Sequence, residues 1–321
     1  MGKIRFGFQI PTWGNRSWKE LTKIIRAVEE LGYDSIWTPD HLFLDERLTS
    51  VVKGDPGRPD MLDTYTTLAA IAALTERVRL GPAMTPIPLY NPSQLAKKVA
   101  TLDLISGGRV ELGLGCGWQE REFVSYGIEW NNFKTRIGKT REGLDLMIKL
   151  WTVDGNVSYE GRYYKTHEAP FYPKPVQKPY PPLWFGGTSD PILKMCVKYD
   201  AVWSPWVLSP SIYAEYLERM RRFADGASKK VSNRQLAVHI IALVKEDFNE
   251  AKREMEETML MLFQGRIDFE RGVFGTKDDC IRRLERYIDV GITHFVLNGY
   301  PYQKDVVSYL GSFADAVFDY F

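Results

Sequence analysis

The sequence predicts an α/β protein made of one domain over residues 1–321, a (β/α)8 TIM barrel with insertions at the C-terminal face. Short β-rich runs alternate with amphipathic segments of helical period, as in right-handed βαβ units. A length of 321 residues suits one barrel with some insertions. Eight strands favour this barrel over an open doubly wound sheet. We expect them at 3–10, 34–38, 77–85, 109–115, 182–186, 201–204, 236–244 and 293–297.

Helix signals lie between these strands. Pro11 ends the first strand, and Ser17 with Glu20 forms a capping box that opens the first helix. Gly32 supplies the stop of that helix. Further helices are predicted at 64–75, 93–105, 139–151, 246–263 and 277–290.

One segment, at about residues 152–180, breaks the rhythm of strand and helix. Turn residues at 154–156 and flanking aromatics indicate a small hairpin, and the prolines at 173 and 175 indicate an extended strip. We interpret it as an insertion over the barrel mouth, because it is too short for a domain.

The composition bounds the partners and the compartment. A formal net charge of +1 gives no field that would attract nucleic acid or an acidic membrane surface. The three cysteines and four histidines show no zinc-like spacing, so we expect no metal site. Free thiols, no signal-peptide core and no long apolar run predict a cytoplasmic protein without a membrane span.

Two glycine-rich strand ends are candidate binding elements. The first, 113–117, lacks the last glycine of the dinucleotide fingerprint. Gly115 and Gly117 mark either a turn that needs positive φ or a place where a flat ring approaches the backbone. The second holds Gly186, Gly187 and Thr188 before a predicted helix, and it is either an anion site or a close-packed turn with a capped helix.

His41 is the leading candidate for chemistry. It follows the second predicted strand, at the edge where barrel enzymes place catalytic residues, and its intrinsic pKa near ~6.5 suits proton transfer. A histidine at such a position can also be structural or solvated. Asp40 precedes it, but neighbouring side chains on an extended segment point apart, so the pair does not indicate a relay.

No acylating, P-loop or zinc-protease motif is present in the sequence, which favours a bound organic cofactor as the source of the chemistry. Taken together, the motifs of the chain resemble those of the luciferase-like monooxygenase superfamily, whose barrels use FMN or the deazaflavin coenzyme F420. The matching stretches are 31–37 with Asp40 and His41, 77–81, 106–115 with Gly117 and Trp118, 159–164, 173–179 through Gly186 and Gly187, and 291–297.

The resemblance implies roles for several residues. His41 matches a histidine near the redox centre of deazaflavin-dependent relatives, a candidate proton donor or substrate contact. Ala83-Met84 matches a non-proline cis peptide that presses on the ring, and 186–188 matches the phosphate-binding stretch. The strip at 152–180 matches a mobile region that closes over substrate. The cofactor-binding residues implied in this way are Asp40, Ala83, Met84, Gly115, Gly117, Gly186, Gly187 and Thr188.

The sequence also departs from the family pattern. Pro82 stands where many relatives carry a small hydroxyl residue. The acidic residue that some sugar-phosphate dehydrogenases of the family use near Cys116 and Trp118 is absent, which argues against such a substrate.

The resemblance implies a hydride-transferring oxidoreductase. We favour coenzyme F420, because the segment Gly117-Trp118 is similar to that subgroup. The alternatives are an FMN-dependent two-component monooxygenase with a separate reductase, and a flavin-binding protein without turnover. The partners expected are a small organic substrate and, as a homodimer, a second copy of the chain. Trp13, Trp118 and Trp206, with Trp203, indicate either a flat, apolar substrate pocket or core packing.

Overall fold

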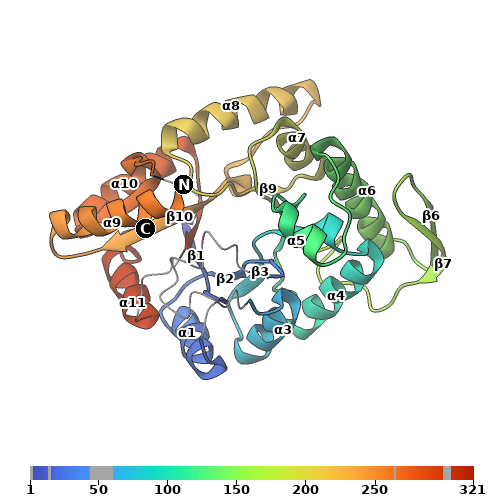
Figure 1. The fold of residues 1–321 in the computed structure, drawn as a ribbon, viewed down its shortest axis with the longest axis horizontal. Helices are drawn as coiled ribbons and strands as arrows, with labels where there is room; N and C mark the ends of the chain where they lie inside the picture. The colour runs from blue at the N-terminus through green and yellow to red at the C-terminus, as the bar shows by residue number, and fades with distance from the viewer. Residues whose placement is uncertain (1–2, 14–15, 44–60, 264, 299–304) are drawn as a thin grey trace.

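The computed structural model describes residues 3–13, 16–43, 61–263, 265–298 and 305–321, and these form an α/β barrel ringed by helices (Figure 1). The strands are β1 (Arg5–Gln9), β2 (Ser35–Thr38), β3 (Arg79–Pro82), β4 (Thr85–Pro86), β5 (Leu112–Gly115), β6 (Asn156–Glu160), β7 (Lys165–Pro170), β8 (Leu183–Phe185), β9 (Val202–Trp203), β10 (Ala237–Val244), β11 (Gly272–Gly275) and β12 (His294–Asn298). The helices are α1 (Trp18–Glu30), α3 (Thr64–Leu74), α4 (Pro92–Ile105), α5 (Glu120–Ser125), α6 (Phe133–Thr152), α7 (Asp190–Tyr199), α8 (Pro210–Gly226), α9 (Phe248–Leu262), α10 (Lys277–Val290) and α11 (Val306–Val317).

Parallel pairing closes the barrel. One sheet runs in the order β11-β10-β12-β1-β2-β3 and the other in the order β4-β5-β8-β9. Parallel bridges join them, Leu80 to Val110 on one side and Trp203 to Leu236 on the other. The eight predicted strands are therefore confirmed as β1, β2, β3, β5, β8, β9, β10 and β12, and the predicted barrel is confirmed with them.

The sequence analysis did not predict β11. This strand pairs with the second half of β10, from Ile241 to Val244. Its sequence is Gly-Val-Phe-Gly, so two of its four side chains are missing and no alternation marks it as a strand.

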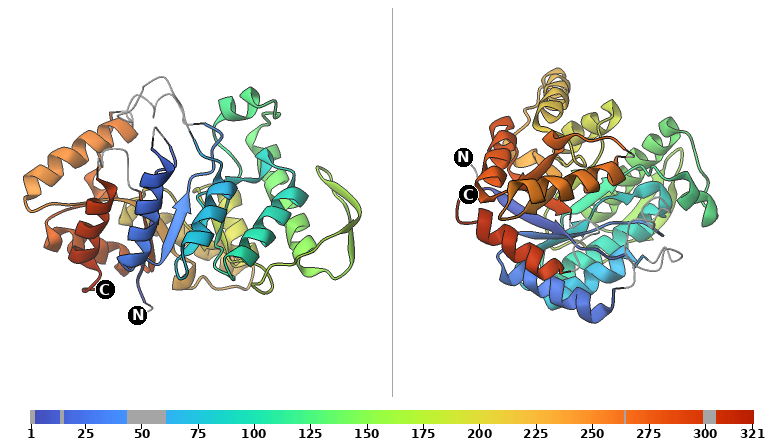
Figure 2. Two further views of the ribbon diagram at one scale, coloured as in Figure 1. Left: turned by 90° about the horizontal axis from the view of Figure 1, so that it is seen from below. Right: turned by 60° about the vertical axis from the view of Figure 1, so that its left-hand side comes forward.

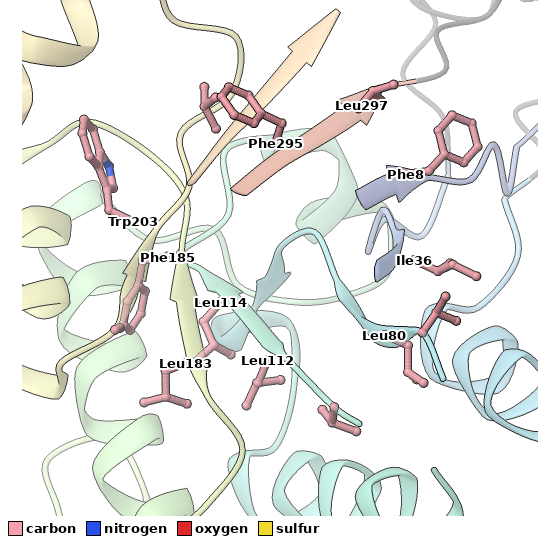
Figure 3. Close-up of a cluster of buried hydrophobic side chains, with 14 of the residues drawn as sticks. Phe8, Ile36, Leu80, Leu112, Leu114, Leu183, Phe185, Trp203, Phe295 and Leu297 are labelled. Atoms are coloured by element: carbon pink, nitrogen blue, oxygen red, sulfur yellow. The ribbon is translucent and has the colours of Figure 1, made fainter. Parts of the chain in front are cut away.

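Side chains of the barrel strands alternate between the helix-facing wall and the barrel interior. The wall belongs to the main core, which includes Phe8, Ile36, Leu80, Leu114, Phe185, Phe295 and Leu297 (Figure 3). The residues one position away form a separate interior cluster of Trp37, Trp184, Ala237 and Val296. Side chains two residues from a member of the interior cluster on the same strand therefore also face the interior.

The predicted helix signals take the expected form. Ser17 and Glu20 make both hydrogen bonds of the capping box before α1. The helix ends at Leu31, followed by Gly32 with a φ of 92°. None of the helices in the described ranges has the length and the apolar composition that a membrane crossing requires.

The insertion at 152–180 does not cover the mouth, so that interpretation is wrong. The hairpin of β6 and β7 projects beyond α6 at the side of the molecule (Figures 1 and 2). The strip that follows it contacts the amino-terminal end of the barrel: the Gln177 amide Nε2 donates to the carbonyl of Val110, just before β5, and to Asp103, in the last turn of α4. The reason is the direction of the chain. A segment that connects a helix to the next parallel strand lies at the amino-terminal end of the strands, opposite to the mouth.

The mouth carries a different insertion. Residues 116–132 connect β5 to α6 and contain α5. This connection follows a strand, so it lies at the carboxyl ends of the strands, and α5 stands there at the end of the barrel opposite to the chain termini (Figure 2, left). The sequence analysis predicts insertions at the C-terminal face but names only 152–180, so it does not predict this segment.

Candidate functional site at the barrel mouth

The predicted site residues lie on strand ends that share one edge of the barrel. His41 follows β2, Ala83 and Met84 lie between β3 and β4, and Gly115 ends β5. The stretch 186–188 connects β8 to α7. All these strands are parallel, so their carboxyl ends meet at the mouth, where barrel enzymes place their active sites.

The segment after β3 turns inward at Met84. The Ala83–Met84 peptide bond is cis, as the family resemblance predicts. A Cβ atom on Gly113 would lie 2.6 Å from the Met84 Sδ atom, and one on Gly186 would lie 3.1 Å from its Cγ atom. These glycines therefore leave room for the Met84 side chain, which lies across the upper part of the barrel.

Asp40 anchors the exit of β2 to this segment. Its carboxyl accepts hydrogen bonds from the Thr85 hydroxyl (2.6 Å) and the Tyr90 hydroxyl (2.8 Å), and the hydroxyls of Tyr65 and Thr85 are 2.9 Å apart. Burial raises the pKa of Asp40 to about 6. The hydrogen bonds from the two hydroxyls and the charge of His41 lower the pKa, but their effect is smaller than that of burial. The carboxyl therefore binds residues of the mouth rather than His41, which agrees with the prediction that the two side chains point apart.

His41 is oriented by a carboxylate that the sequence analysis missed. Its Nδ1 atom lies 3.2 Å from both carboxylate oxygens of Glu122, on α5. Glu122 is buried and also accepts the backbone N–H of Leu42 at 2.5 Å. A carboxylate can only accept, so the neutral imidazole carries its proton on Nδ1 and leaves Nε2 as the acceptor. An acidic residue in the connection after the fourth predicted strand, at the same edge as His41, was the available signal.

The tryptophans divide between mouth and core. The Trp118 ring is 55% exposed and meets the His41 ring edge-on at 5.8 Å. Trp206 is 44% exposed and packs near Phe263 at 5.7 Å. Trp13 is buried, and Trp203 is a core residue that packs on Tyr213. Only Trp118 is thus seen beside His41.

The start of α7 has an open geometry. Gly187 has a φ of 99°, and its carbonyl accepts a hydrogen bond from the Trp203 Nε1 atom at 2.8 Å. Ser189 is the N-cap by position, but among the described residues its hydroxyl makes no capping hydrogen bond. Asp190 pairs instead with Arg219 at 2.7 Å. The first-turn N–H groups and two hydroxyls, of Thr188 and Ser189, remain for an acceptor such as a phosphate.

Metal ligands do not gather in the described part of the chain, where no three His, Cys, Asp or Glu side chains are grouped to hold an ion. The mouth therefore brings together a histidine that contacts a buried carboxylate, a segment that turns inward at Met84 and a helix start without a side-chain cap.

Comparison with known proteins agrees with this geometry. The family model for luciferase-like monooxygenases matches residues 5–271. The F420-dependent glucose-6-phosphate dehydrogenase of Amycolatopsis mediterranei (strain U-32) is 27% identical over 309 residues, covering 88% of each chain.

Two solved structures share the fold. An F420-dependent secondary alcohol dehydrogenase, in complex with an F420–acetone adduct, has a TM-score of 0.80 at 24% identity and covers 98% of both chains. The FMN complex of the oxygenating constituent of 3,6-diketocamphane monooxygenase from Pseudomonas putida has a TM-score of 0.78 at 17% identity and covers 99% of both chains.

The fold and the relatives that it matches define a TIM-barrel oxidoreductase of the luciferase-like type. Within that class, the chain belongs to the luciferase-like monooxygenase family.

Proposed function

We propose that this protein is a coenzyme F420-dependent oxidoreductase that transfers a hydride between the deazaflavin and a small organic substrate. The observation that carries the proposal is His41, held by Glu122 at a mouth that also contains the Ala83–Met84 bulge. The relative from Amycolatopsis supports F420 as the cofactor.

The residues of the mouth fit a flat, phosphorylated cofactor. The bulge at Met84 offers a surface for one face of a ring, and the start of α7 offers N–H groups and hydroxyls for a phosphate. Gly187 and Thr188 belong to that stretch, while Gly117, with a φ of 77°, shapes the turn that leads to α5. The deazaflavin supplies hydride transfer when it is bound.

The chain itself supplies proton transfer. His41 presents Nε2 as an acceptor, so it takes the hydroxyl proton when an alcohol is oxidised and returns it when a ketone is reduced. Glu122 keeps the proton of the neutral ring on Nδ1. The exposed Trp118 ring beside His41 offers an apolar wall for the substrate, which favours a flat or apolar molecule over a sugar phosphate.

A binding titration followed by turnover tests this function. We expect micromolar binding of F420, seen as a change in its fluorescence, and F420 reduction with members of a panel of secondary alcohols. His41→Asn should lower kcat/KM by about 100-fold or more and leave the Kd for F420 within about threefold. Binding of FMN without F420 would overturn the cofactor assignment, and full activity in His41→Asn would overturn the role of His41.

An FMN-dependent two-component monooxygenase is the second candidate, supported by the fold shared with the FMN-bound diketocamphane enzyme. That reading needs a separate reductase and substrate-dependent oxygen uptake with reduced FMN. The third candidate is a flavin-binding protein without turnover. In that case the cofactor should bind, but no substrate should change its absorption spectrum.

We also propose a homodimer formed through the barrel helices, working in the cytoplasm. The three cysteines are free thiols, which suits a reducing compartment. Sedimentation at micromolar concentration should give twice the chain mass, and a monomer would refute the dimer.

A further inference from the structure

Arg136 is a buried cation without an anionic partner in the described part of the chain. It lies near the start of α6 and is 8% exposed. Its Nη1 atom donates to the carbonyl of Asn131, just before the helix begins, while its Nε–H group has no acceptor among the described residues. No carboxylate of those residues pairs with it either. Buried arginines are almost always paired, so we expect an anionic partner that is not part of the chain.

An aromatic ring covers one face of this guanidinium. The Arg136 Cζ atom lies 3.7 Å from the centroid of the Trp130 ring, which in turn packs on Phe123 with centroids 5.1 Å apart. A cation–π contact offsets only part of the cost of taking a charge out of water. The ring acts on the face of the guanidinium, whereas the N–H groups point outward in its plane. Trp130 therefore orients the group and leaves the Nε edge to bind an anion.

The guanidinium lies at the barrel mouth. The connection 116–132 joins β5 to α6, so α6 begins at the carboxyl ends of the strands, and the start of a helix favours negative charge. Burial raises the pKa of the Cys116 thiol, and the positive charge of Arg136 lowers it, which places that charge near the residue that directly follows β5. Cys116 is partly exposed. An anion that enters the mouth can therefore approach Arg136 from the side of Cys116.

The same connection holds a second donor without an acceptor. Gln119 directly precedes α5 and is 5% exposed, and its Nε2 atom has no partner among the described residues. A side-chain amide and a guanidinium edge both offer N–H groups, and the two oxygens of a carboxylate can accept from both. Because the buried, unpartnered atoms of Gln119 and Arg136 are both donors, the missing ligand is an acceptor.

We propose that Arg136, with Gln119, binds a carboxylate of the substrate, so that the substrate is a hydroxy acid or an oxo acid with an apolar body. The inference rests on the proposed function, in which the alcohol or ketone group reacts beside His41. Cys116 and Trp118 are two residues apart, and the Trp118 ring meets the His41 ring at 5.8 Å. One turn of the chain thus joins the charge of Arg136 to the histidine. The carboxylate does not react: the carbinol carbon gives a hydride to the deazaflavin, His41 takes the hydroxyl proton, and the hydroxy acid becomes an oxo acid.

Alkylation of Cys116 tests anion binding without cofactor or turnover. Cys196 and Cys280 are buried, so iodoacetamide should label Cys116 first, as mass spectrometry can show. A carboxylate bound to Arg136 neutralises the charge that lowers the pKa of the thiol, so saturating benzoate should slow labelling at about pH 8 by at least about threefold. Benzamide, the uncharged analogue, should leave the rate unchanged at the same ionic strength. Equal slowing by both compounds, or no slowing by benzoate, would overturn the proposal.

Two variants localise the effect. Arg136→Met removes the charge and keeps an unbranched side chain, so it should label more slowly than unmodified protein, and benzoate should not change its rate. Arg141→Met is the matched control on α6, since Arg141 is exposed, and it should respond to benzoate as unmodified protein does. A benzoate effect that persists in Arg136→Met would refute the site. The comparison of benzoate with benzamide in unmodified protein decides the matter if Arg136→Met fails to fold.

Turnover with F420 tests the substrate class. Unmodified protein should oxidise hydroxy acids with kcat/KM at least about tenfold higher than their methyl esters, and Arg136→Met should remove this preference through KM. The Kd for F420 should stay within about threefold in this variant. A Kd weakened by about tenfold or more would assign Arg136 to the cofactor and overturn the substrate assignment, as would a preference for the esters. Absence of F420 binding would overturn the proposed function and the substrate class, whereas a benzoate effect on labelling would still support the anion site.

Discussion

Asp40 and His41 are neighbours in the chain with separate tasks. Asp40 binds hydroxyls of residues that follow the bulge, and His41 binds Glu122 on α5. The alternation of an extended segment predicts that these side chains diverge. It does not predict their partners, because Glu122 is 81 residues away and its position depends on the fold of the whole connection after β5.

At the residue scale, Asp40→Asn should remove a pH dependence of stability. The folded pKa of Asp40, about 6, exceeds its unfolded value near ~3.9, so the native state binds the extra proton between these values. The carboxyl therefore lowers stability as pH rises from about 4 to 6, by on the order of 3 kcal/mol. Urea unfolding at pH 4.5 and 7 should show Asn gaining stability relative to Asp at the higher pH.

Thr85→Val is the companion variant. It removes one hydroxyl donor to the carboxylate, so the pKa of Asp40 should rise further and the loss of stability should extend to higher pH. Parallel pH profiles for Asp40→Asn and unmodified protein would contradict the raised pKa.

Glu122→Gln should reverse the tautomer of His41. A glutamine amide can keep the hydrogen bond from Leu42 N and present its NH2 group to Nδ1, which moves the imidazole proton to Nε2. We expect kcat to fall by at least about tenfold with little change in the Kd for the cofactor. Glu120→Gln is the control on the same helix, since Glu120 is exposed. A kcat unaffected by Glu122→Gln would mean that Glu122 holds the loop without orienting the histidine.

At the element scale, the turn from β5 to α5 depends on Gly117. Its φ is 77°, and a Cβ atom there would lie 2.6 Å from the Phe123 ring. Gly127 has a similar φ of 71°, but a Cβ atom on it would have no atom within 4 Å. Gly127→Ala should cost about 1–2 kcal/mol for the backbone alone, and Gly117→Ala at least about 1 kcal/mol more for the clash. Chemical denaturation measures both, and equal losses would exclude the clash.

The same scale shows which elements the sequence could predict. The eight barrel strands with alternating or continuous apolar runs were predicted, and the capping box of Ser17 and Glu20 correctly marked the start of α1. The glycine-flanked β11 was missed because it lacks a pattern. The insertion was recognised but placed at the wrong end, although its position between α6 and β8 already implied the amino-terminal side.

At the scale of the whole molecule, buried histidines and the buried Asp40 have opposite effects on the free energy of unfolding as pH falls. Burial lowers the pKa of His239 to about 4 and holds that of His294 well below its usual range. In the unfolded state a histidine has a pKa near ~6.5 and is protonated below that pH, whereas these two buried histidines stay neutral in the native state. They therefore lower the free energy of unfolding as pH falls below about 6.5. Asp40 acts in the opposite direction, so we expect the pH profile of stability to be the sum of these contributions.

His294→Gln should separate these contributions. Relative to unmodified protein, the variant should gain about 2 kcal/mol between pH 7.5 and pH 5, because the unfavourable protonation is gone. The exposed His167, on β7, provides the control, and His167→Gln should leave the profile unchanged. Urea midpoints at the two pH values decide the comparison, and identical shifts for both variants would refute the assignment to burial.

The β6–β7 hairpin lies away from the barrel mouth, so changes in the hairpin need not affect the residues at the mouth. Glu142 accepts backbone N–H groups of Arg162, Tyr163 and Tyr164, and the Lys149 ammonium donates to the carbonyl of Ser158, so these two side chains of α6 hold the hairpin. Since this attachment lies away from the strand ends that carry His41, the hairpin can lengthen, shorten or acquire a binding partner without disturbing the mouth. It is the natural point on this barrel for fusing a label or a second protein.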